Sequence, residues 1–563
     1  MTIMSCQPAH ESNTPGTTEP SPVSSGSKLE IAADTPKRMQ QLPRTSIDYD
    51  RSLLNDNEKQ VVAKLVEASK LIDDIYWRQV SEDNPQLRTK LESQAPSSAL
   101  DRAGYDYFLA NKGRWDRLKQ GDPFIAPFGA AGAKPPGAAF YPADMKKEEF
   151  EQYVAAHPDK KDALQGLFTV VRRKGSDLEA IPYSTYYKEQ IEPAAARLSE
   201  AAALAQNPSL RNYLTKLAAA FKADNYRDSD MAWMDLNSPI EVVIGPYEVY
   251  EDELFNYKAS FESFVTVVDH AESEKLAAYA HHLPDMERNL PEPEKYKNLN
   301  RGTESPIKVV QEVFTAGDAR RGVQTSAFNL PNDEFVREKK GSKKVLLKNV
   351  MDAKFSRSGR PISQRVLEQS LTSLVSFDAY FNHTLFHELS HGLGPGYITN
   401  EKGEKVEARI PLKNLYSTIE ECKADVVGLW NILYAQKNKL LSSFDERQLY
   451  ATYTGLMFRS MRFGIDEAHG RGTAVQWNWL REKGAITPTA DGKYTFDAAK
   501  YRDGIQSLAT ELLTIEATGD FNRANTLLEK YGKETPEMVG VIAKLNDIPV
   551  DINPYFPGAG EQQ

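Results

Sequence analysis

The hydrophobic residues of this chain are spaced in two different ways. From about residue 47 to residue 225, apolar side chains recur every three or four positions, as in Val61–Ile75, which predicts helices. Between about 238 and 336, Ile240–Ile244 and Phe261–Val268 are short runs of β-branched and aromatic residues, which are typical of strands. Helical spacing returns in the rest of the chain. The pattern therefore predicts a mainly α protein with a smaller β part.

An H-E-x-x-H motif, with its histidines at His387 and His391, lies near the end of a helical run in which apolar residues recur from Leu371 onward. Residues four apart share one face of a helix, so the two imidazoles can bind one zinc ion at about 2.0–2.1 Å. Glu388 would lie beside the ion, where it can take a proton from a bound water. His383 is about 12 Å of helix away from His391, so we expect a packed or hydrogen-bonded neighbour there, not a ligand.

A catalytic zinc ion usually has three protein ligands, so a third must come from elsewhere in the chain. Ser417 and Glu420 have the spacing of a capping box, which predicts the start of another helix after the motif. On that helix Glu421 and Asp425 are four apart and share a face. One of these carboxylates can bind zinc while the other orients a histidine. The alternative is an acidic first turn that the helix dipole favours.

These two segments resemble those of the dipeptidyl-peptidase III family of zinc exopeptidases. The family has an E-E-C-[KR]-A-[DE] helix, and residues 420–425 of this chain match that motif in full. The resemblance implies that Glu421 is the third zinc ligand, and that Glu420 and Asp425 are carboxylates that support the ligands. The best-known members have the longer form H-E-x-x-G-H, whereas this chain has the five-residue form. Catalytic efficiency and substrate range therefore need not follow those members.

The resemblance extends to residues 244–250, with the family pattern I-G-x-x-E-x-Y, and to an N-x-P-N element. It implies that Glu248 binds the free amino terminus of a peptide, and that Asn329 and Asn332 hold its first residues and backbone. It also implies that the Tyr250 hydroxyl hydrogen-bonds the scissile carbonyl as negative charge develops, which stabilises the transition state selectively. Taken alone, the same residues also fit an ordinary strand and an Asn-Pro turn.

Two features farther along the chain concern charge near the site. His469 matches the family histidine that assists transition-state stabilisation from the opposite wall of the cleft, although a lone histidine is more often structural. The basic run Arg337–Lys344 is predicted to be a solvated loop. Cations near a cleft can also attract the terminal carboxylate of a peptide.

The resemblance covers about residues 45–550 and implies an α+β fold with two lobes around a wide cleft. We assign residues 45–355 mostly to a substrate-binding lobe of mixed α and β structure with a small β-barrel. Residues 356–563 form the mostly helical zinc-binding lobe in this assignment. The resemblance further implies that an extended peptide binds across the cleft as an added strand. Closure of the lobes would then bring Tyr250 and His469 toward the reacting carbonyl.

Composition adds predictions about partners and location. The net charge of −10 disfavours nucleic acids and anionic membrane surfaces, and no hydrophobic run approaches the length of a membrane span. Residues 1–44 are predicted to be a disordered tether, because their first part is rich in Ser, Thr, Pro and Gly. Cys6 and the three residues before it resemble the end of a bacterial lipoprotein signal. A lipid on Cys6 would anchor the protein in the bacterial cell envelope, and a cytoplasmic location is the alternative.

Together these observations predict a zinc-dependent aminodipeptidase with one Zn²⁺ per chain, which releases dipeptides from the amino terminus of short unblocked peptides. A different zinc peptidase on the same ligands, either an endopeptidase or an aminopeptidase that removes single residues, is one alternative. A peptide-binding lipoprotein without turnover is another. Glu388 argues against the latter, because a binding protein needs no base between its ligands.

Overall fold

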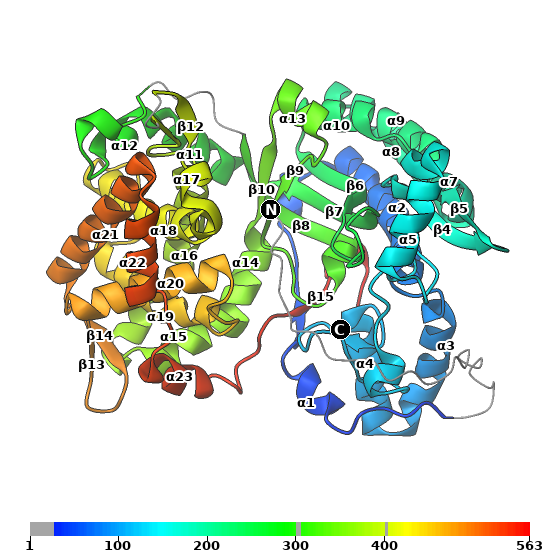
Figure 1. Ribbon diagram of the computed structural model, residues 1–563, viewed down its shortest axis with the longest axis horizontal. Coiled ribbons are helices and arrows are strands. Elements are labelled where there is room, and N and C mark those ends of the chain that lie inside the picture. Colours follow the sequence, from blue (N-terminus) through cyan, green and yellow to red (C-terminus); the bar gives the residue numbers. More distant parts are fainter. Residues whose placement is uncertain (1–27, 300–305, 400–402, 563) are drawn as a thin grey trace.

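The computed structural model describes residues 28–299, 306–399 and 403–562. These residues form two lobes, which lie side by side in Figure 1, one mostly helical and one built around a sheet. Each lobe has its own large hydrophobic core. The expected fold class, mainly α with a smaller β part in two lobes, is confirmed.

A five-stranded mixed sheet forms the centre of the sheet lobe. Its first two strands contain both runs that were predicted as strands, which confirms that prediction. All neighbouring strands are antiparallel except β8 and β10, which are parallel. The sheet is open, with β6 and β9 at its edges, so the predicted small barrel is a half-barrel. In spatial order the strands are β6 (Ile240–Glu248), β7 (Ser260–Val268), β8 (Ile307–Gly317), β10 (Lys343–Leu347) and β9 (Ala327–Leu330).

Long helices pack on this sheet. α2 (Asp56–Val80) lies against β7 and β8, and it begins with a capping box. Its regularly spaced apolar residues are buried, which confirms the predicted helix at Val61–Ile75. α8 (Lys188–Leu204) packs on α2, and α9 (Pro208–Ala223) packs on α8. The other α-helices before the sheet in the described part of the chain are α1 (Thr35–Met39), α3 (Asn84–Gln94), α4 (Ala99–Asn111), α5 (Lys147–Ala156), α6 (Lys161–Gln165), α7 (Tyr183–Tyr186) and α10 (Arg227–Met234).

The N-terminal prediction is wrong for residues 28–44. This segment forms α1, and its side chains Ile31 and Leu42 are buried in a small hydrophobic core with residues from α3 and α4. The few apolar residues of the segment are enough to anchor it. A prediction from average composition misses them, because most of the neighbouring residues are polar. Cys6, on which the prediction of a lipid anchor rests, lies outside the described residues.

Three helices form the centre of the helical lobe: α16 (Phe377–Ser390), α18 (Tyr416–Lys437) and α20 (Ala468–Glu482). Two further helices pack around them, α19 (Glu446–Met461) and α21 (Ala498–Thr518). The core between them is made of aliphatic and aromatic side chains. The smaller helices of this lobe are α11 (His270–His281), α12 (Leu283–Asn289), α15 (Arg360–Val366), α17 (Arg409–Leu412), α22 (Phe521–Tyr531) and α23 (Pro536–Ala543).

The strands β8 and β10 form the junction between the lobes. Val309 and Leu346 belong to the core of the helical lobe, whereas their neighbours Val310 and Val345 belong to the core of the sheet lobe. Side chains alternate between the two faces of a strand. Each of these strands therefore has one face in each lobe, and Figure 1 shows β10 between the lobes.

The chain passes between the lobes more than once. It leaves the sheet lobe after β7, returns in β8, and leaves again within α14 (Lys348–Lys354), whose Val350 and Met351 lie in different cores. Near the end of the chain, Ile548 lies in the helical core and Ile552 in the sheet core. The last strand, β15, then pairs in parallel with β1, which lies near the N-terminal end of the described residues. Their bounds are Asn553–Tyr555 and Arg44–Ser46.

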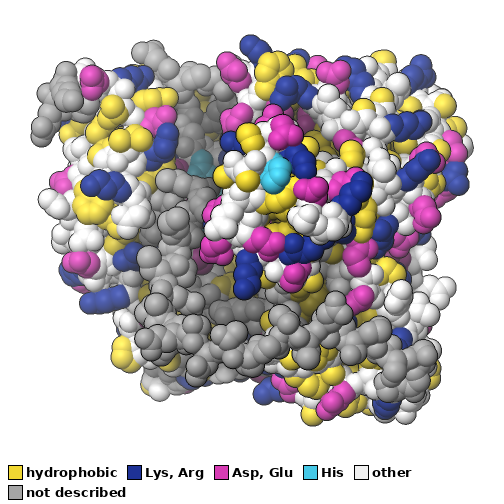
Figure 2. All heavy atoms as spheres, turned by 45° about the vertical axis from the view of Figure 1, so that its right-hand side comes forward, with side chains coloured by type: hydrophobic (Ala, Val, Ile, Leu, Met, Phe, Trp, Pro, Cys, Tyr) yellow, Lys and Arg dark blue, Asp and Glu magenta, His cyan; other side chains and the backbone are white. Residues whose placement is uncertain are grey.

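The surface carries charges of both signs. On the face drawn in Figure 2, acidic and basic side chains are interspersed, with small groups of hydrophobic side chains between them. Among the described residues, no helix combines the length and the apolar character that a membrane crossing requires.

Candidate metal centre and substrate cleft

α16 carries the H-E-x-x-H motif at its C-terminal end. The helix is shorter than predicted, because the Ser376 hydroxyl caps it and Leu371 lies in a separate 3₁₀ helix. Such a cap accepts hydrogen bonds from free N–H groups at the start of a helix. The spacing of hydrophobic residues does not reveal it, because the capping residue is polar. His387 and Glu388 lie in the last turn, and His391 is the residue that follows the helix.

α18 carries the carboxylates that were predicted to face this motif. The predicted capping box is wrong, because the helix begins at Tyr416 and Ser417 lies within its first turn. A short 3₁₀ helix runs directly into α18, so Leu415 already has a helical backbone and no side chain caps the helix. Glu421 and Asp425 nevertheless share the face that points at α16, as the bonds described below show.

α16 and α18 approach each other closely at Gly428. A β carbon built on this glycine would lie 3.1 Å from the backbone nitrogen of His387 and 3.2 Å from the carbonyl carbon of Phe386. A larger residue would push the helices apart, because both neighbouring atoms belong to the backbone. Gly428 therefore helps to set the distance between the two histidines of α16 and the carboxylates of α18.

His387, His391 and Glu421 converge on one point. The two Nε2 atoms lie 3.1 Å apart, and Glu421 Oε2 lies 3.4 Å from His387 Nε2 and 3.7 Å from His391 Nε2. Two ligands of a tetrahedral zinc ion are separated by about 3.3 Å. Glu421 Oε2 is buried and accepts no hydrogen bond from the described residues. A buried oxygen of this kind needs a partner, and a metal ion supplies one, so the three side chains fit a metal site.

Two further carboxylates hold the imidazole rings. His387 Nδ1 lies 2.8 Å from Asp425 Oδ1, and His391 Nδ1 lies 2.7 Å from Glu420 Oε1. Burial opposes a charge on His387, but Asp425 and Glu421 outweigh it and raise the pKa of this histidine to about 10. The pKa of Asp425 is held well below its usual range by the same hydrogen bond, against the effect of burial. The hydrogen bonds fix each ring with Nε2 toward the metal position.

Glu388 has a cationic partner from the other lobe. The ammonium group of Lys344, in β10, donates to Glu388 Oε2 at 2.7 Å and to the Glu388 backbone oxygen at 3.2 Å. Burial favours the neutral acid, but Lys344 outweighs it and lowers the pKa of Glu388. The run Arg337–Lys344 was predicted to be a solvated loop. It consists instead of the end of α13 (Glu334–Lys340) and the start of β10, with Lys343 buried.

A cavity of about 570 Å³ opens beside α16, and His387, Glu388 and His469 line it. His469 lies in the first turn of α20. Its Nδ1 lies 3.2 Å from Glu421 Oε2, although 60% of its side chain is exposed. His383 also lines the cavity and hydrogen-bonds the Asp425 backbone oxygen, as expected of a neighbour. Much of the remaining wall comes from apolar side chains of α19.

The other predicted substrate residues lie in the sheet lobe. Glu248, Tyr250, Asn329 and Asn332 line a second cavity of about 360 Å³. Val323 lines both this cavity and the one beside α16, so the two adjoin. The structure therefore places the predicted site residues in two neighbouring groups. These four form one group, and the other consists of His387, Glu388, His391, Glu420, Glu421, Asp425 and His469. Tyr250 is 65% exposed in this arrangement.

The second cavity is strongly acidic. Burial and the neighbouring Asp318 raise the pKa of Glu248 to about 7. Burial and the carboxylate of Glu248 raise the pKa of Glu262 well above its usual range. Glu248 in turn raises the pKa of the Tyr250 hydroxyl. These shifts show that negative charge is crowded here, so the cavity suits a cationic group.

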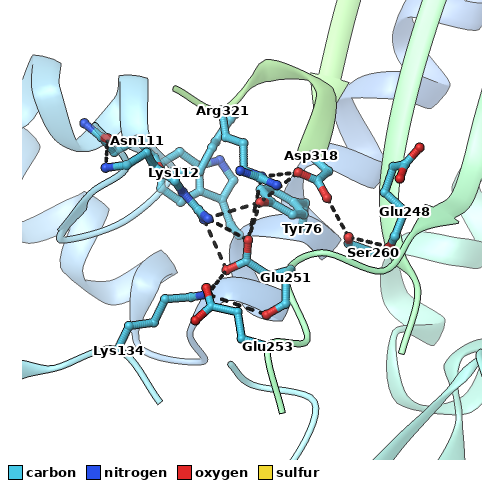
Figure 3. A network of polar contacts seen from close by, with 12 residues as sticks. Tyr76, Asn111, Lys112, Lys134, Glu248, Glu251, Glu253, Ser260, Asp318 and Arg321 are labelled. Atoms are coloured by element: carbon cyan, nitrogen blue, oxygen red, sulfur yellow. Dashed lines mark hydrogen bonds and ion pairs between the residues drawn. The ribbon is translucent and has the colours of Figure 1, made fainter. Parts of the chain in front are cut away.

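A network of polar contacts behind Glu248 fixes its surroundings, as Figure 3 shows. Ser260 Oγ lies 2.9 Å from the Glu248 backbone oxygen and 2.7 Å from Asp318 Oδ2, and its hydroxyl can donate to either oxygen. Arg321 donates to Asp318 and lies 3.7 Å from Glu251. Arginine charges thus compensate Asp318 and Glu251. The Glu248 carboxylate itself has no hydrogen bond or ion pair within the described residues, so it is free to bind a substrate group.

Comparison with known proteins identifies the family. Peptidase family M49 matches residues 143–406. The solved structure of DPP III from Caldithrix abyssi is similar with a TM-score of 0.87 and 48% sequence identity, over 92% of this chain and 98% of that one. This chain belongs to the dipeptidyl-peptidase III family. The dipeptidyl-peptidase III of Corallococcus sp. strain EGB is also similar, with a TM-score of 0.74 and 40% identity over 95% and 98% of the two chains.

A curated relative carries a different name. Nudix hydrolase 3 of Arabidopsis thaliana is 37% identical over 92% of this chain and 73% of its own length. Its name does not change the assignment, because the family match and both solved structures identify the peptidase fold. The family resemblance predicted from the motifs is therefore confirmed, and this chain is a metallopeptidase of that family.

Sequence reasoning missed two lysines at the centre of this peptidase. Lys344 is described above. Lys423 is buried in α18, where its ammonium donates to Glu420 Oε1 at 2.9 Å and to the backbone oxygens of Ser390 and Leu393. It thereby holds Glu420 under His391 and joins the end of α16 to α18. The position of Lys423 inside the E-E-C-K-A-D motif could have indicated its contact with Glu420. No sequence feature near Lys344 indicated its contact with Glu388.

Proposed function

We propose that this member of the dipeptidyl-peptidase III family is a zinc enzyme that removes dipeptides from the unblocked amino terminus of short peptides. One observation carries the proposal. The three convergent metal ligands and Glu388 lie next to the acidic second cavity, in which the Glu248 carboxylate has no hydrogen-bond or ion-pair partner among the described residues. The first group suits hydrolysis, and the second suits a free amino terminus.

The donor set supports zinc as the metal. His387, His391 and Glu421 offer two imidazole nitrogens and one carboxylate oxygen, which is a common ligand set of catalytic zinc sites. Three protein ligands leave a fourth position for water. A zinc ion held by these three residues would polarise a water molecule and lower its pKa to about 7, which would make a nucleophile available near neutral pH.

Glu388 acts as the base in this proposal. Its carboxylate takes a proton from the attacking water and then gives a proton to the amine that leaves. His469 lines the same cavity as Glu388 and can donate a hydrogen bond to the developing oxyanion. Asp425 and Glu420 keep the rings of His387 and His391 in the orientation that the ligands need.

The acidic cavity determines where the peptide is cut. Glu248 binds the terminal ammonium group, while Asn329 and Asn332 hold the first residues, so the second peptide bond is the one that reaches Glu388. Tyr250 is too exposed to act as described until the lobes close on a peptide, and closure also excludes water from the site.

Mass spectrometry of peptide products tests this function. An unblocked octapeptide is incubated with zinc-loaded protein, beside the same peptide acetylated at its amino terminus. We expect stepwise loss of dipeptides from the free peptide alone. Internal cleavage of both peptides would contradict the role of Glu248 and indicate an endopeptidase. Loss of single residues would indicate an aminopeptidase.

A further inference from the structure

We propose that Lys344 is a positioning residue, which holds the Glu388 carboxylate in the place where it acts. The inference rests on the proposed role of Glu388 as the base. It assigns a function to a side chain that comes from the other lobe and from a strand of the substrate-binding sheet.

Two contacts carry the inference. The Lys344 ammonium lies 2.7 Å from Glu388 Oε2 and 3.2 Å from the backbone oxygen of the same residue. A cation that binds both atoms fixes the side-chain torsions of Glu388, because it ties the carboxylate to its own backbone. Only 20% of the Lys344 side chain and 23% of the Glu388 side chain are exposed. A pair this well shielded keeps more of its attraction than a surface pair does.

The lysine is placed by the register of the sheet. Lys344 of β10 stands directly opposite Asn329 of β9. Directly opposite residues of an antiparallel pair share a face of the sheet. Lys344 also shares its face of β10 with Leu346, which belongs to the core of the helical lobe. Lys344 therefore stands between Asn329, where the peptide is held, and Glu388, where its bond is hydrolysed.

This arrangement links the base to the substrate strand. Without Lys344, the Glu388 carboxylate is held by α16 alone and can turn to other rotamers of comparable energy. A catalytic group must lie within about 0.5 Å of its productive position. Loss of the lysine is therefore expected to slow the chemical step, while peptide binding and metal binding are retained. Outer partners of this kind typically contribute about 10-fold to 100-fold.

Kinetics of two Lys344 variants test the inference. Lys344→Met keeps the length of the side chain and removes its charge, whereas Lys344→Arg keeps the charge and the donors. For dipeptide release from an unblocked peptide, we expect kcat of Lys344→Met to fall about 10-fold to 100-fold. Its KM and zinc content should stay within about twofold of the wild type. Lys344→Arg should recover most of kcat.

Lys348→Met is the matched control. Lys348 is the first residue of α14, four positions farther along the chain, and pairs with Glu272 at 3.0 Å and Asp269 at 3.4 Å, with 26% of its side chain exposed. Neither carboxylate partner of Lys348 is Glu388, so kcat should not change. An unchanged or raised kcat in Lys344→Met would overturn the inference, and so would a change confined to KM. Loss of kcat in Lys344→Arg as large as in Lys344→Met would also overturn it.

A double-mutant cycle provides a readout that does not depend on activity. Melting temperatures of the metal-free protein are measured for Lys344→Met, Glu388→Gln and the double variant. If the two side chains are paired, the change in the double variant will differ from the sum of the single changes. Additive changes would overturn the inference. If the wild type releases no dipeptides, the proposed function fails, and this cycle still decides whether Lys344 holds Glu388.

Discussion

Replacing Glu248 by Gln should make the protein more stable and a poorer enzyme. The folded protein raises the pKa of Glu248 from 4.5 to about 7, because the side chain is buried and lies near Asp318. The charged form is therefore disfavoured in the folded state, and the free energy of unfolding falls as the pH rises from 4.5 through 7. At about 1.4 kcal/mol per pH unit, this amounts to about 3 kcal/mol. Partial exposure of the side chain reduces it to about 2 kcal/mol.

Glutamine has the shape of glutamate but cannot carry the charge, so Glu248→Gln removes this cost. We expect urea unfolding to give a variant that is about 2 kcal/mol more stable than the wild type at pH 8 and nearly equal to it at pH 4. Glu253→Gln is the control, because Glu253 is 59% exposed and should change stability little at either pH. An equal effect of Glu248→Gln at both pH values would refute the argument that the cavity penalises its charge.

The same substitution should weaken peptide binding. A hydrogen bond to a charged group contributes about 1.5–3 kcal/mol, so KM for an unblocked peptide should rise by about 10-fold to 100-fold. In the wild type, KM should also rise as the pH falls below about 7, because Glu248 becomes protonated and loses its attraction for the ammonium group. This dependence should disappear in Glu248→Gln. A variant with wild-type KM would refute the assignment of Glu248 as the amine anchor.

Three further predictions concern the helical lobe. Glu388→Gln should lower kcat by at least about 100-fold while zinc stays bound, as measured by kinetics together with metal analysis; near wild-type turnover would contradict its role as the base. Asp425→Asn should weaken zinc affinity about 10-fold to 100-fold in a chelator competition assay, because the ring of His387 loses its charged partner; unchanged affinity would contradict this. Gly428→Val should lower the free energy of unfolding by about 1–3 kcal/mol, because the added carbons meet the backbone of α16. Gly540→Val, whose β carbon meets open space, should cost less in the same denaturation experiment.

The parts of the site that depend on helix periodicity could be predicted from the sequence. His387 and His391 share a face because they are four apart on one helix, and Glu421 and Asp425 share a face for the same reason. The helix boundaries were less predictable. The start of α18 depends on a 3₁₀ helix that runs into it, so Ser417 does not serve as a cap.

Contacts that depend on sheet register could not be predicted. Lys344 reaches Glu388 because β10 pairs with β9 and β8 in one particular register, and no local pattern in the sequence specifies that pairing. A run of basic residues looks the same whether it is solvated or contains a lysine that pairs with a partly buried carboxylate in the other lobe. The anchoring of residues 28–44 was missed for a similar reason, because a few apolar side chains find partners that lie far away in the sequence.

The repeated passage of the chain between the lobes limits how they can move. Two bodies joined by a single flexible linker can swing and twist in any direction. Here the covalent connections run after β7, into β8, through α14 and near residue 550, and β15 is fastened to β1. Several connections restrict the relative motion of two lobes more than one linker does, because each connection fixes another pair of points on them. Opening and closing should therefore be confined to fewer paths than a single linker would allow, and Lys344, in a strand at the junction between the lobes, should keep its distance from Glu388 throughout.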